Sequence, residues 1–383
     1  MNSSISRPDP IRYCAKCLEP STRPGQNFDA RGLCVPCALL ADMKPADWDS
    51  RRAELRGIVA WSRERARSGY DSIIGVSGGK DSTRLALFAR EIGLTPLLVC
   101  CTYPPHQMTT RGAYNLSNLV SLGFDTITVN IAPGVYRDAQ KKAFLEQGNW
   151  ARPSELALYS SVVKIAIDWG IPLVCYGENP YLRLGTGIES RDGNAERLTT
   201  MHTLGGGDLT PYLSAGIARK QLHWYEYPTP DALARWAGRM IFLGYYMEDF
   251  HDLVNAKIAI EHGLRTRTGP HADPARTGSI YNFSALDDDF VIVNQYFKYL
   301  KLGFGLVSQD CSLRIRDGLM TREEALDLVR RYDGKCDEHY IRRFCAYLGI
   351  SRADFDVAVE RFRNPELWIR EGNGEWRLKH PPA

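Results

Sequence analysis

The sequence predicts an α/β fold in which a doubly wound parallel sheet is preceded by a small cysteine-rich module and followed by a helical C-terminal region. Short apolar runs alternate with stretches of helical spacing between residues 70 and 176, which is the pattern of right-handed βαβ units. Four of the ten cysteines fall within the first 37 residues, and helical spacing dominates after residue 228. These three observations define the expected architecture.

We expect three parts along the chain of 383 residues. Residues 1–45 form the cysteine-rich module, residues 46–227 form the α/β domain, and residues 228–383 form a helical region that contacts a substrate or a partner. The first part has little apolar periodicity and cannot build a hydrophobic core alone. Another source of stability is therefore needed there.

Two Cys-x2-Cys pairs, Cys14 with Cys17 and Cys34 with Cys37, are separated by sixteen residues. This spacing is typical of a tetrahedral four-cysteine zinc site. Four thiolates close the coordination shell, so we expect a structural Zn²⁺ that stabilises a small ribbon and activates no nucleophile. The alternative is a set of reduced thiols or a redox pair.

Composition excludes several classes of protein. Hydrophobic residues make up 44% of the chain, which disfavours disorder, and no apolar run approaches the ~20 residues needed to cross a bilayer. Residues 1–10 are polar and lack the apolar stretch of a secretory signal, so we expect a cytoplasmic protein with reduced thiols. The net charge of +3 is too small to argue for a nucleic-acid partner.

The elements of the α/β part follow in order. Leu55, Ile58 and Val59 give residues 48–68 the pattern of an amphipathic helix that connects the module to the sheet. The predicted strands cover residues 70–76, 96–102, 126–131 and 172–176. The predicted helices between them cover residues 85–92, 111–122 and 154–169. Residues 185–227 lose strand spacing, and we expect a long excursion there that faces the substrate.

Beyond Pro230 the spacing predicts a series of helices. They cover residues 233–246, 286–302, 321–332, 338–348 and 351–361. Thr321 and Glu324 have the spacing of a capping box, which marks the start of the third of them.

Residues 77–82, Ser-Gly-Gly-Lys-Asp-Ser, follow the first predicted strand and open a helix. In this context backbone N–H groups and the helix N-terminus hold phosphate oxygens. Gly78 and Gly79 can take positive φ and let the backbone approach an anion closely. The segment differs from the G-x4-G-K-[ST] loop, because Asp81 follows Lys80. A tight connection without a ligand is the alternative for a glycine-rich turn.

Ligands of doubly wound sheets bind at the carboxyl ends of the strands. Glu178 and Asn179 follow the fourth predicted strand, and Thr102 ends the second. We expect Glu178 and Asn179 to share one crevice with residues 77–82 and to position a substrate or Mg²⁺. Thr102 is a further candidate for contact with a nucleotide.

Residues 77–82 resemble the SGGxDS motif of the PP-loop ATP pyrophosphatases. These enzymes are similar in fold to the adenine nucleotide α-hydrolases and cleave ATP to AMP and pyrophosphate. The resemblance implies that the leaving pyrophosphate is bound by Ser77, Gly78, Gly79, Lys80, Asp81 and Ser82. Lys80 would act as a point charge, and Asp81 would act through Mg²⁺.

Further stretches resemble the N-acetyl sugar amidotransferases of surface-polysaccharide and flagellin-glycan biosynthesis, which install acetamidino groups on sugars. These stretches are the two Cys-x2-Cys pairs and residues 112–115, 122–125, 176–180, 244–246, 281–287, 296–305, 315–318, 320–325 and 332–334. They span nearly the whole chain.

This resemblance implies an AMP-forming ligase. ATP adenylates the oxygen of an N-acetyl amide, ammonia attacks the amide carbon, and AMP leaves to give an acetamidine. The site must orient a neutral amide and exclude water, because water would hydrolyse the activated amide. Lys298 and Lys301 lie three residues apart on a predicted helix and could stabilise phosphate charge or contact an anionic sugar nucleotide. A solvated helix face is the alternative for these two lysines.

The resemblance also implies partners that supply ammonia. No second α/β region of the sequence carries a cysteine followed by a spaced histidine and glutamate, so we expect the chain to lack a glutaminase of its own. A separate glutaminase and an ammonia-channelling barrel subunit are the implied partners.

A tRNA thiolase is the main alternative function, because some PP-loop enzymes combine a four-cysteine zinc ribbon with this loop. That reaction needs cysteines near the nucleotide and a basic face for the tRNA backbone. Cys101 and Cys175 fall near predicted strand ends, but free cysteines in buried strands are usually packing residues. A non-catalytic zinc-ribbon adaptor is a further alternative, and it would not need an intact pyrophosphate loop.

Overall fold

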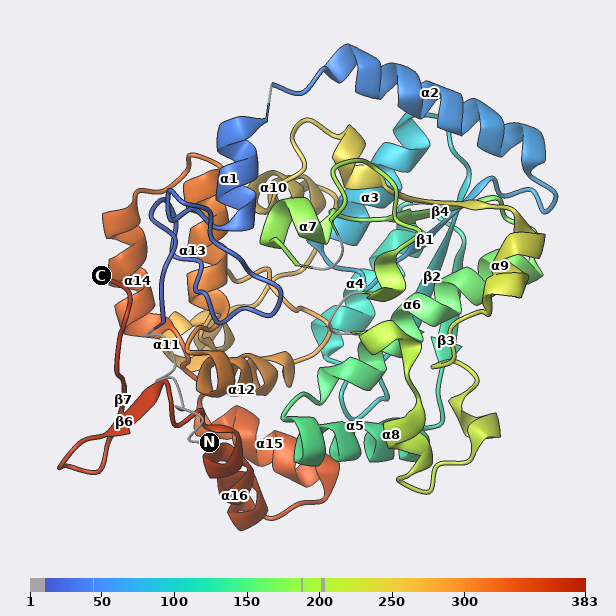
Figure 1. The fold of residues 1–383 in the computed structure, drawn as a ribbon. Coiled ribbons are helices and arrows are strands. Elements are labelled where there is room, and N and C mark those ends of the chain that lie inside the picture. Colours follow the sequence, from blue (N-terminus) through green and yellow to red (C-terminus); the bar gives the residue numbers. More distant parts are fainter. Residues whose placement is uncertain (1–10, 44, 187–188, 201–203) are drawn as a thin grey trace, which may run out of the picture.

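The computed structural model describes residues 11–43, 45–186, 189–200 and 204–383. Residues 1–10, where we expect no secretory signal, lie outside this description. The sheet with its covering helices forms one half of the molecule, and the C-terminal helices form the other half (Figure 1). The predicted site residues are distributed over both halves.

Five parallel strands form a sheet in the order β3-β2-β1-β4-β5. Their bounds are β1 Ser72–Gly75, β2 Pro96–Thr102, β3 Thr126–Asn130, β4 Leu173–Tyr176 and β5 Arg239–Phe242. The first residue of β1, Ser72, pairs with Pro96 of β2 on one side and with Leu173 of β4 on the other. The strand order reverses between β1 and β4, which is the point where doubly wound sheets bind ligands. The predicted doubly wound parallel sheet is confirmed.

The strand β5 corrects one expectation about an element. The spacing predicts a single helix over residues 233–246, but the structure has α9 (Pro230–Trp236), then β5, then a short 3₁₀ turn. Met240, Ile241 and Phe242 are buried beside β4. The prediction of a helix was wrong because periodicity alone does not distinguish a short buried strand from a buried helix segment. The domain boundary at residue 227 stays a prediction. The strand β5 lies beyond that boundary in the sequence but belongs to the sheet.

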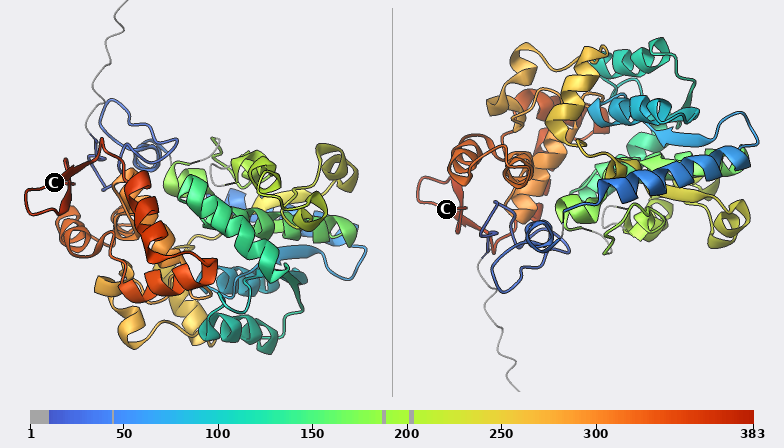
Figure 2. Two further views of the ribbon diagram at one scale, coloured as in Figure 1. Left: turned by 90° about the horizontal axis from the view of Figure 1, so that it is seen from below. Right: turned by 90° about the horizontal axis from the view of Figure 1, so that it is seen from above.

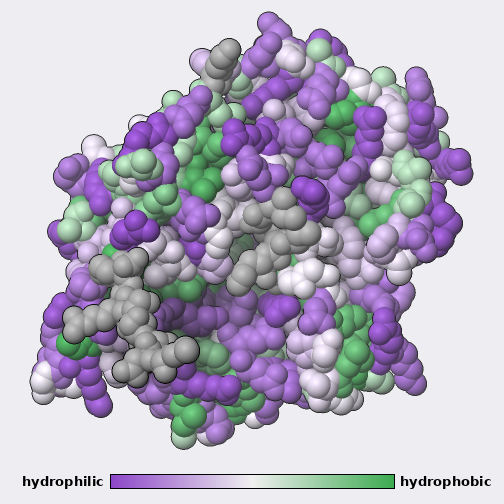
Figure 3. Space-filling model, viewed as in Figure 1, coloured by the Kyte–Doolittle hydropathy of each residue, from purple (hydrophilic) through white to green (hydrophobic). Residues whose placement is uncertain are grey.

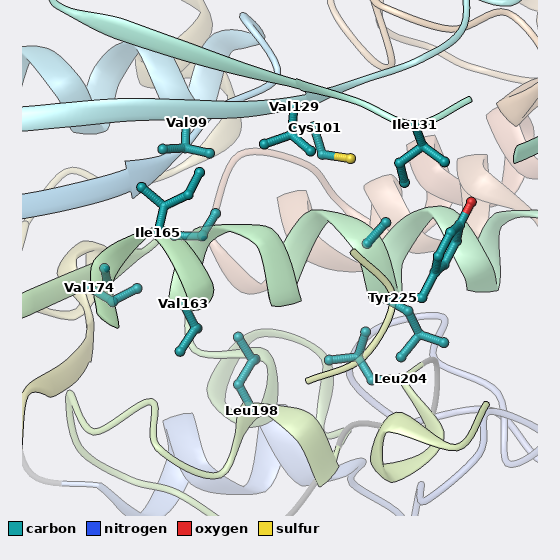
Figure 4. Packing of buried hydrophobic residues seen from close by; sticks show 14 of the residues in the cluster. Val99, Cys101, Val129, Ile131, Val163, Ile165, Val174, Leu198, Leu204 and Tyr225 are labelled. Atoms are coloured by element: carbon teal, nitrogen blue, oxygen red, sulfur yellow. The ribbon is translucent and has the colours of Figure 1, made fainter. Parts of the chain in front are cut away.

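Helices cover both faces of the sheet. On one face lie α2 (Trp48–Arg65), α3 (Lys80–Glu91) and α4 (Thr110–Ser121). On the other face lie α5 (Pro133–Gln147) and α6 (Ala151–Asp168). In the core on this second face, Val99 of the sheet faces Ile165 of α6, whereas Val163 lies on the far side of that helix, towards Leu198 (Figure 4).

The segment after β4 packs largely on the same face as α6. It contains α7 (Pro180–Leu184) and α8 (Thr210–Leu213), and it buries Leu198, Tyr212 and Tyr225 in the core. Its residues 187–188 and 201–203 lie outside the described part of the chain. A role of this segment in facing the substrate stays a prediction.

The C-terminal half is helical, as the sequence predicts. Its elements are α10 Asp252–Glu261, α11 Pro274–Thr277, α12 Val291–Leu302, α13 Leu306–Arg316, α14 Arg322–Tyr332, α15 Glu338–Leu348 and α16 Arg352–Phe362, followed by the hairpin β6 Trp368–Arg370 and β7 Trp376–Leu378. An aromatic cluster joins this half to α5, because Phe144 packs against Phe297, Phe344 and Phe355. Figure 2 shows the C-terminal helices beside the sheet in two further views.

The N-terminal module packs on the C-terminal helices. It contains α1 (Val35–Asp42), and its Leu18 is buried in a cluster with Val307 and Val329 of α13 and α14. The Leu18 N–H donates to Ser312 Oγ at 3.2 Å. The module therefore completes its apolar packing with residues that come almost 300 positions later.

Among the described residues, no helix is both long and apolar enough to span a bilayer. On the face drawn in Figure 3, apolar side chains form small separate patches among hydrophilic ones.

Candidate functional site

The glycine-rich loop of residues 77–82 connects β1 to α3 at the carboxyl edge of the sheet. Gly78 has φ +74°, and a Cβ there would lie 2.8 Å from the backbone nitrogen of Leu116 in α4. Only glycine fits this conformation and this close approach. Gly79 caps α3, so the free N–H groups of the first helical turn lie at the loop. This is the geometry that holds phosphate oxygens.

Lys80 begins α3 and lies between two carboxylates. Its Nζ atom is 2.5 Å from Asp81 Oδ2 and 2.7 Å from Asp252 Oδ1 of α10. Asn255, one turn along α10, donates from Nδ2 to Asp81 Oδ1 at 2.8 Å. The helix α10 thus fixes the positions of both charged side chains of the loop.

The charge of Lys80 follows from these neighbours. Burial disfavours the ammonium, but the adjacent Asp81 and Asp252 carboxylates outweigh burial and raise the pKa of Lys80. Burial also acts on Asp252, yet the Lys80 ammonium holds the pKa of that carboxyl below its ordinary value. The loop therefore presents a fixed positive charge, which suits a phosphate ligand.

A cavity of about 300 Å³ lies in front of the loop. Its walls come from the loop, from the end of β4, from α10, from residues 283–287, and from α12 and α13. The polar and charged lining residues are Ser77, Lys80, Asp81, Ser82, Glu178, Arg183, His251, Asp252, Asn255, Ser284, Asp287, Gln295, Gln309 and Asp310. Both halves of the molecule thus contribute to one polar cavity.

Glu178 reaches this cavity from the end of β4, as the sequence predicts. Burial raises the pKa of the Glu178 carboxyl, and the nearby Asp81 carboxylate raises it further. Two carboxylates close together in a phosphate site are suitable ligands for Mg²⁺. The charge of a bound cation would lower the cost of ionising both.

Several buried polar atoms of residues that line this cavity have no hydrogen-bond partner among the described residues. They are His251 Nδ1, Asn255 Oδ1, Gln295 Oε1 and Asp310 Oδ2. Buried polar atoms are nearly always paired, so unpaired ones that line a cavity point to a ligand or water there. Burial raises the pKa of the Asp310 carboxyl to about 8, with a contribution from the Asp252 carboxylate.

The remaining sequence candidates lie outside the lining of this cavity. Asn179 caps α7, since its Oδ1 accepts from the Tyr181 and Leu182 N–H groups, and its Nδ2 donates to the carbonyl of Asp192 at 3.0 Å. Thr102 donates to Asn130 Oδ1 at 2.5 Å. These contacts hold loops in place, and a direct role of either residue stays a prediction.

The two lysines of α12 have different surroundings. Lys301 donates to the Gln147 carbonyl at 2.9 Å, at the C-terminal end of α5, and this contact suits the negative end of a helix dipole. Lys298 does not line the cavity, but its Nζ donates to Oε1 of the lining residue Gln309 at 3.3 Å. Burial, aided by the Arg23 guanidinium, lowers the pKa of Lys298 to about 7. Their roles in phosphate or sugar binding stay predictions.

Sequence reasoning missed the contribution of α10 and α13. Asp252, Asn255 and Asp310 lie on helices that the apolar spacing does not reveal. Residues 281–287 were singled out only because they resemble a family motif, and the structure brings residues 283–287 of that motif to the cavity. Ala285 in this segment has φ +46°, a conformation that few L-residues adopt.

The four N-terminal cysteines form a compact buried cluster. The ligand atoms of Cys14, Cys17, Cys34 and Cys37 all lie within 4.8 Å of one another, and Cys17 Sγ is 3.7 Å from Cys34 Sγ. A tetrahedron with metal–sulfur bonds of about 2.3 Å has sulfur–sulfur edges of about 3.8 Å. The cluster therefore fits a tetrahedral Zn²⁺, as the spacing predicts.

Second-sphere donors support this fit. The Glu19 N–H donates to Cys17 Sγ at 3.4 Å, and Arg316 of α13 donates to the same sulfur at 3.4 Å. Arg316 also donates to the Arg183 carbonyl at 3.0 Å, and Arg183 is 3.5 Å from Asp252. A continuous set of contacts thus runs from the cysteine cluster to the carboxylate that holds Lys80.

Cys101 and Cys175 do not line the cavity in front of the glycine-rich loop of residues 77–82, which we call the phosphate loop. Cys101 lies in the core on the α6 face of the sheet, and Cys175 of β4 lies in the core on the α3 face. Burial raises the pKa of Cys101 to about 12 and also raises the pKa of Cys175. Neither residue lines the cavity, and neither has the properties of a reactive thiolate.

Comparison with known proteins adds one match. Residues 277–380 match a family model described as "LPS biosynthesis protein WbpG-like, C-terminal domain". WbpG is a member of the N-acetyl sugar amidotransferase family, so the match confirms the resemblance over this part of the chain. No curated protein matches the chain.

Proposed function

Because the chain carries the C-terminal domain of the WbpG-like LPS biosynthesis proteins, we propose that it is an ATP-dependent sugar amidotransferase. In this reaction the acetamido oxygen of an N-acetyl sugar is adenylated and replaced by nitrogen from ammonia. The products are an acetamidino sugar, AMP and pyrophosphate. The sugar belongs to a surface glycan such as an O-antigen or a flagellin glycan, and the reaction takes place in the cytoplasm.

One observation carries this proposal. The same cavity is lined by Ser284, Gln295 and Asp310 of the matched C-terminal domain and by Lys80 and Asp81 of the glycine-rich loop. If the loop and the C-terminal domain bound unrelated ligands, they would not have to line one cavity. Their shared cavity supports a reaction between a nucleotide and a sugar.

The loop side of the cavity suits the pyrophosphate of ATP. The first-turn N–H groups of α3 and the Lys80 ammonium would hold its oxygens. Asp81, Asp252 and Glu178 would hold Mg²⁺, which neutralises charge on the leaving pyrophosphate when it is bound. Asn255 keeps Asp81 in position through its 2.8 Å hydrogen bond.

The opposite wall suits a neutral amide. Gln295 on this wall and Asn255 beside the loop offer unpaired buried oxygens that can accept from the amide N–H. The amide oxygen would then face the α-phosphorus, form a bond to it, and release pyrophosphate. Attack of ammonia on the amide carbon breaks the carbon–oxygen bond, and AMP leaves with the former amide oxygen.

Asp310 is the candidate for taking a proton from the attacking nitrogen. Asp310 lines the cavity and its Oδ2 is unpaired; because its pKa is raised to about 8, its ionised form, which becomes populated as the pH approaches 8, is a stronger proton acceptor than an ordinary aspartate. Lys298 lies close enough to stabilise its ionised form.

The ammonia source and the metal belong to the same proposal. We propose that a separate glutaminase and a barrel subunit deliver ammonia to this cavity. The buried cysteine cluster would hold a structural Zn²⁺ that fixes the N-terminal module on α13.

Turnover by the full chain tests the proposal. Incubation with ATP, an ammonium salt and candidate N-acetyl sugars should release AMP and give a product whose mass falls by the difference between an oxygen atom and an NH group. Lys80→Ala should abolish AMP release, because the loop loses its fixed positive charge, while the exposed Lys257→Ala on α10 should not. Circular dichroism checks that both variants fold.

Two outcomes would contradict the proposal. Release of AMP only in the presence of tRNA would favour the thiolase alternative. Full turnover by Lys80→Ala would remove the phosphate loop from the reaction.

A further inference from the structure

A second cavity, of about 650 Å³, lies near the first one and takes no part in the chemistry described above. It lies between the start of α4, residues 265–271 and the start of α15. Its lining residues are Met108, Thr109, Thr110, Arg111, Arg265, Thr266, Thr268, His271, Asp289, His339 and Arg343. A cavity of this size can hold a nucleotide-sized ligand.

Arginines dominate the charge of this second cavity. Asp289 accepts from Arg111, from Arg267 at 2.7 Å and from Arg343 at 3.2 Å. Three guanidinium groups thus share one carboxylate, which they keep ionised: burial raises its pKa, but the Arg267 and Arg111 charges outweigh burial and lower it. Arg265 adds a fourth guanidinium, held against the Tyr114 ring at 3.3 Å.

The remaining nearby groups do not cancel this charge. Burial raises the pKa of Asp288 to about 8, so this carboxyl is largely neutral near pH 7. Asp287, with a pKa of about 6, faces the first cavity. His271 stays neutral because burial and the neighbouring arginines lower its pKa. Three lining arginines, Arg111, Arg265 and Arg343, less the Asp289 carboxylate leave the second cavity with a charge of about +2, and the buried Arg267 behind Asp289 adds a further guanidinium.

Several donors in the second cavity have no acceptor among the described residues. Arg265 makes its ring contact with Tyr114 but no ion pair, and Arg111 Nε is buried without a hydrogen-bond partner. The N–H groups of Thr110 and Arg111 lie in the first turn of the twelve-residue helix α4 and have no acceptor within the helix. Unpaired donors around excess positive charge suit an anion with several oxygens.

The two cavities are separated by one short segment. Asp287 lines the first cavity and Asp289 lines the second, and these residues are two apart, so their Cα atoms lie at most about 7 Å from each other. The Thr109 N–H donates to the Asp287 carbonyl at 2.9 Å. Gly112 allows this packing, because a Cβ there would lie 2.4 Å from Asp287 Cα.

We propose that the second cavity binds the diphosphate through which the sugar is attached to its carrier. The inference rests on the proposed function, which places the acetamido group of the same molecule in the first cavity. A sugar with its acetamido group in one cavity and its anionic anchor in the other would span the segment 287–289. A diphosphate diester carries two negative charges on several oxygens, which suits the surplus arginines.

Binding of three probes to the full chain tests this inference. Uridine diphosphate represents a nucleotide carrier, farnesyl diphosphate represents a polyprenyl carrier, and inorganic phosphate represents a free anion. Arg343→Gln should weaken binding of one diphosphate about tenfold in calorimetry, because a charged donor is lost. Arg342→Gln, the exposed neighbour on α15 that does not line the cavity, is the matched control and should bind as the native chain does.

If Arg343→Gln weakens the binding of uridine diphosphate, the carrier is a nucleotide; if it weakens the binding of farnesyl diphosphate, the carrier is a polyprenyl lipid. Arg265→Gln should weaken the same diphosphate, while ATP affinity stays unchanged in both variants, since ATP belongs to the phosphate loop. Binding of inorganic phosphate without either diphosphate would overturn the inference. Loss of diphosphate binding in Lys80→Ala but not in Arg343→Gln would also overturn it, because the anion would then occupy the loop.

Failure of the proposed function has a different outcome. A chain that binds a diphosphate through Arg343 but never releases AMP with any N-acetyl sugar would refute the amidotransferase proposal and leave the anion site in place.

Discussion

At the scale of single residues, two carboxylates determine the surroundings of the Lys80 ammonium. The ammonium is shared by Asp81 within the loop and by Asp252 from α10, at 2.5 and 2.7 Å. A phosphate ligand has to compete with these carboxylates or recruit a cation to them. We therefore expect Asp252, which lies outside the glycine-rich motif, to tune this competition.

The first residue-scale prediction concerns Asp252→Asn. The change removes one of the two carboxylates that fix Lys80, and it also removes a candidate Mg²⁺ ligand. We expect kcat/KM for ATP to fall about tenfold, equivalent to about 1.4 kcal/mol. Asp249→Asn is the matched control, since Asp249 pairs with Arg84 and does not line the first cavity. Equal kinetics for both variants would show that α10 does not tune the loop.

The second residue-scale prediction concerns Asp310 and pH. Burial raises the pKa of its carboxyl to about 8, so the folded chain keeps a proton that the unfolded chain releases above about pH 4. This contribution to stability is present at low pH and is lost as the pH rises towards 8. The native chain should therefore lose stability relative to Asp310→Asn over that range, by at most about 1.4 kcal/mol per pH unit.

Urea unfolding of both proteins at several pH values measures this difference. Asp288 shifts in the same direction but is present in both proteins, so its effect cancels. Parallel stability curves would mean that Asp310 titrates normally. The variant should also lose amidotransferase activity if Asp310 accepts the proton from the attacking nitrogen.

At the scale of elements, the sequence predicts those that bury a regular apolar face. The first four strands of the sheet follow from apolar runs, and α14 follows from the capping box of Thr321 and Glu324, which the structure contains. The helices α10 and α13 do not follow. The buried residues of α10 are Asn255, Ala256 and Ala259, and α13 buries polar residues such as Asp310 beside its apolar ones. Small or polar buried residues leave no apolar period to detect.

The same cause limits prediction of the site. The loop of residues 77–82 is contiguous, so its chemistry is visible in the sequence. Asp252 and Asp310 acquire their surroundings only when α10 and α13 pack beside α3 and α12. Asn179 is placed correctly at the end of β4, yet its hydrogen bonds show that it holds the following loop.

The element-scale prediction concerns the cysteine cluster. Cys14→Ser should release about one zinc per chain and destabilise the N-terminal module. Contacts through Arg316 and Arg183 lead from the cluster to Asp252, so we also expect weaker ATP binding. Metal analysis and ATP titration measure the two effects. Cys336→Ser, a free cysteine outside the cluster, is the control, and equal zinc content in both variants would contradict the assignment.

At the scale of the whole molecule, distant parts of the chain line the cavity in front of residues 77–82. The sheet half supplies the loop of residues 77–82, the C-terminal helices supply further lining residues, and Arg316 of α13 donates to Cys17 Sγ of the N-terminal module. The total charge of +3 is an average that hides a strongly basic second cavity. Local charge there arises from arginines that are distant in sequence, which is why composition alone does not predict it.

The most direct measurement of the central claim follows one oxygen atom. An N-acetyl sugar labelled with heavy oxygen in its acetamido group is incubated with the full chain, ATP and ammonium, and the AMP is examined by mass spectrometry. If the amide oxygen attacks the α-phosphorus, the heavy oxygen must appear in AMP and must be absent from pyrophosphate and from the acetamidino product. Unlabelled AMP formed together with the acetamidino sugar would contradict the proposed mechanism.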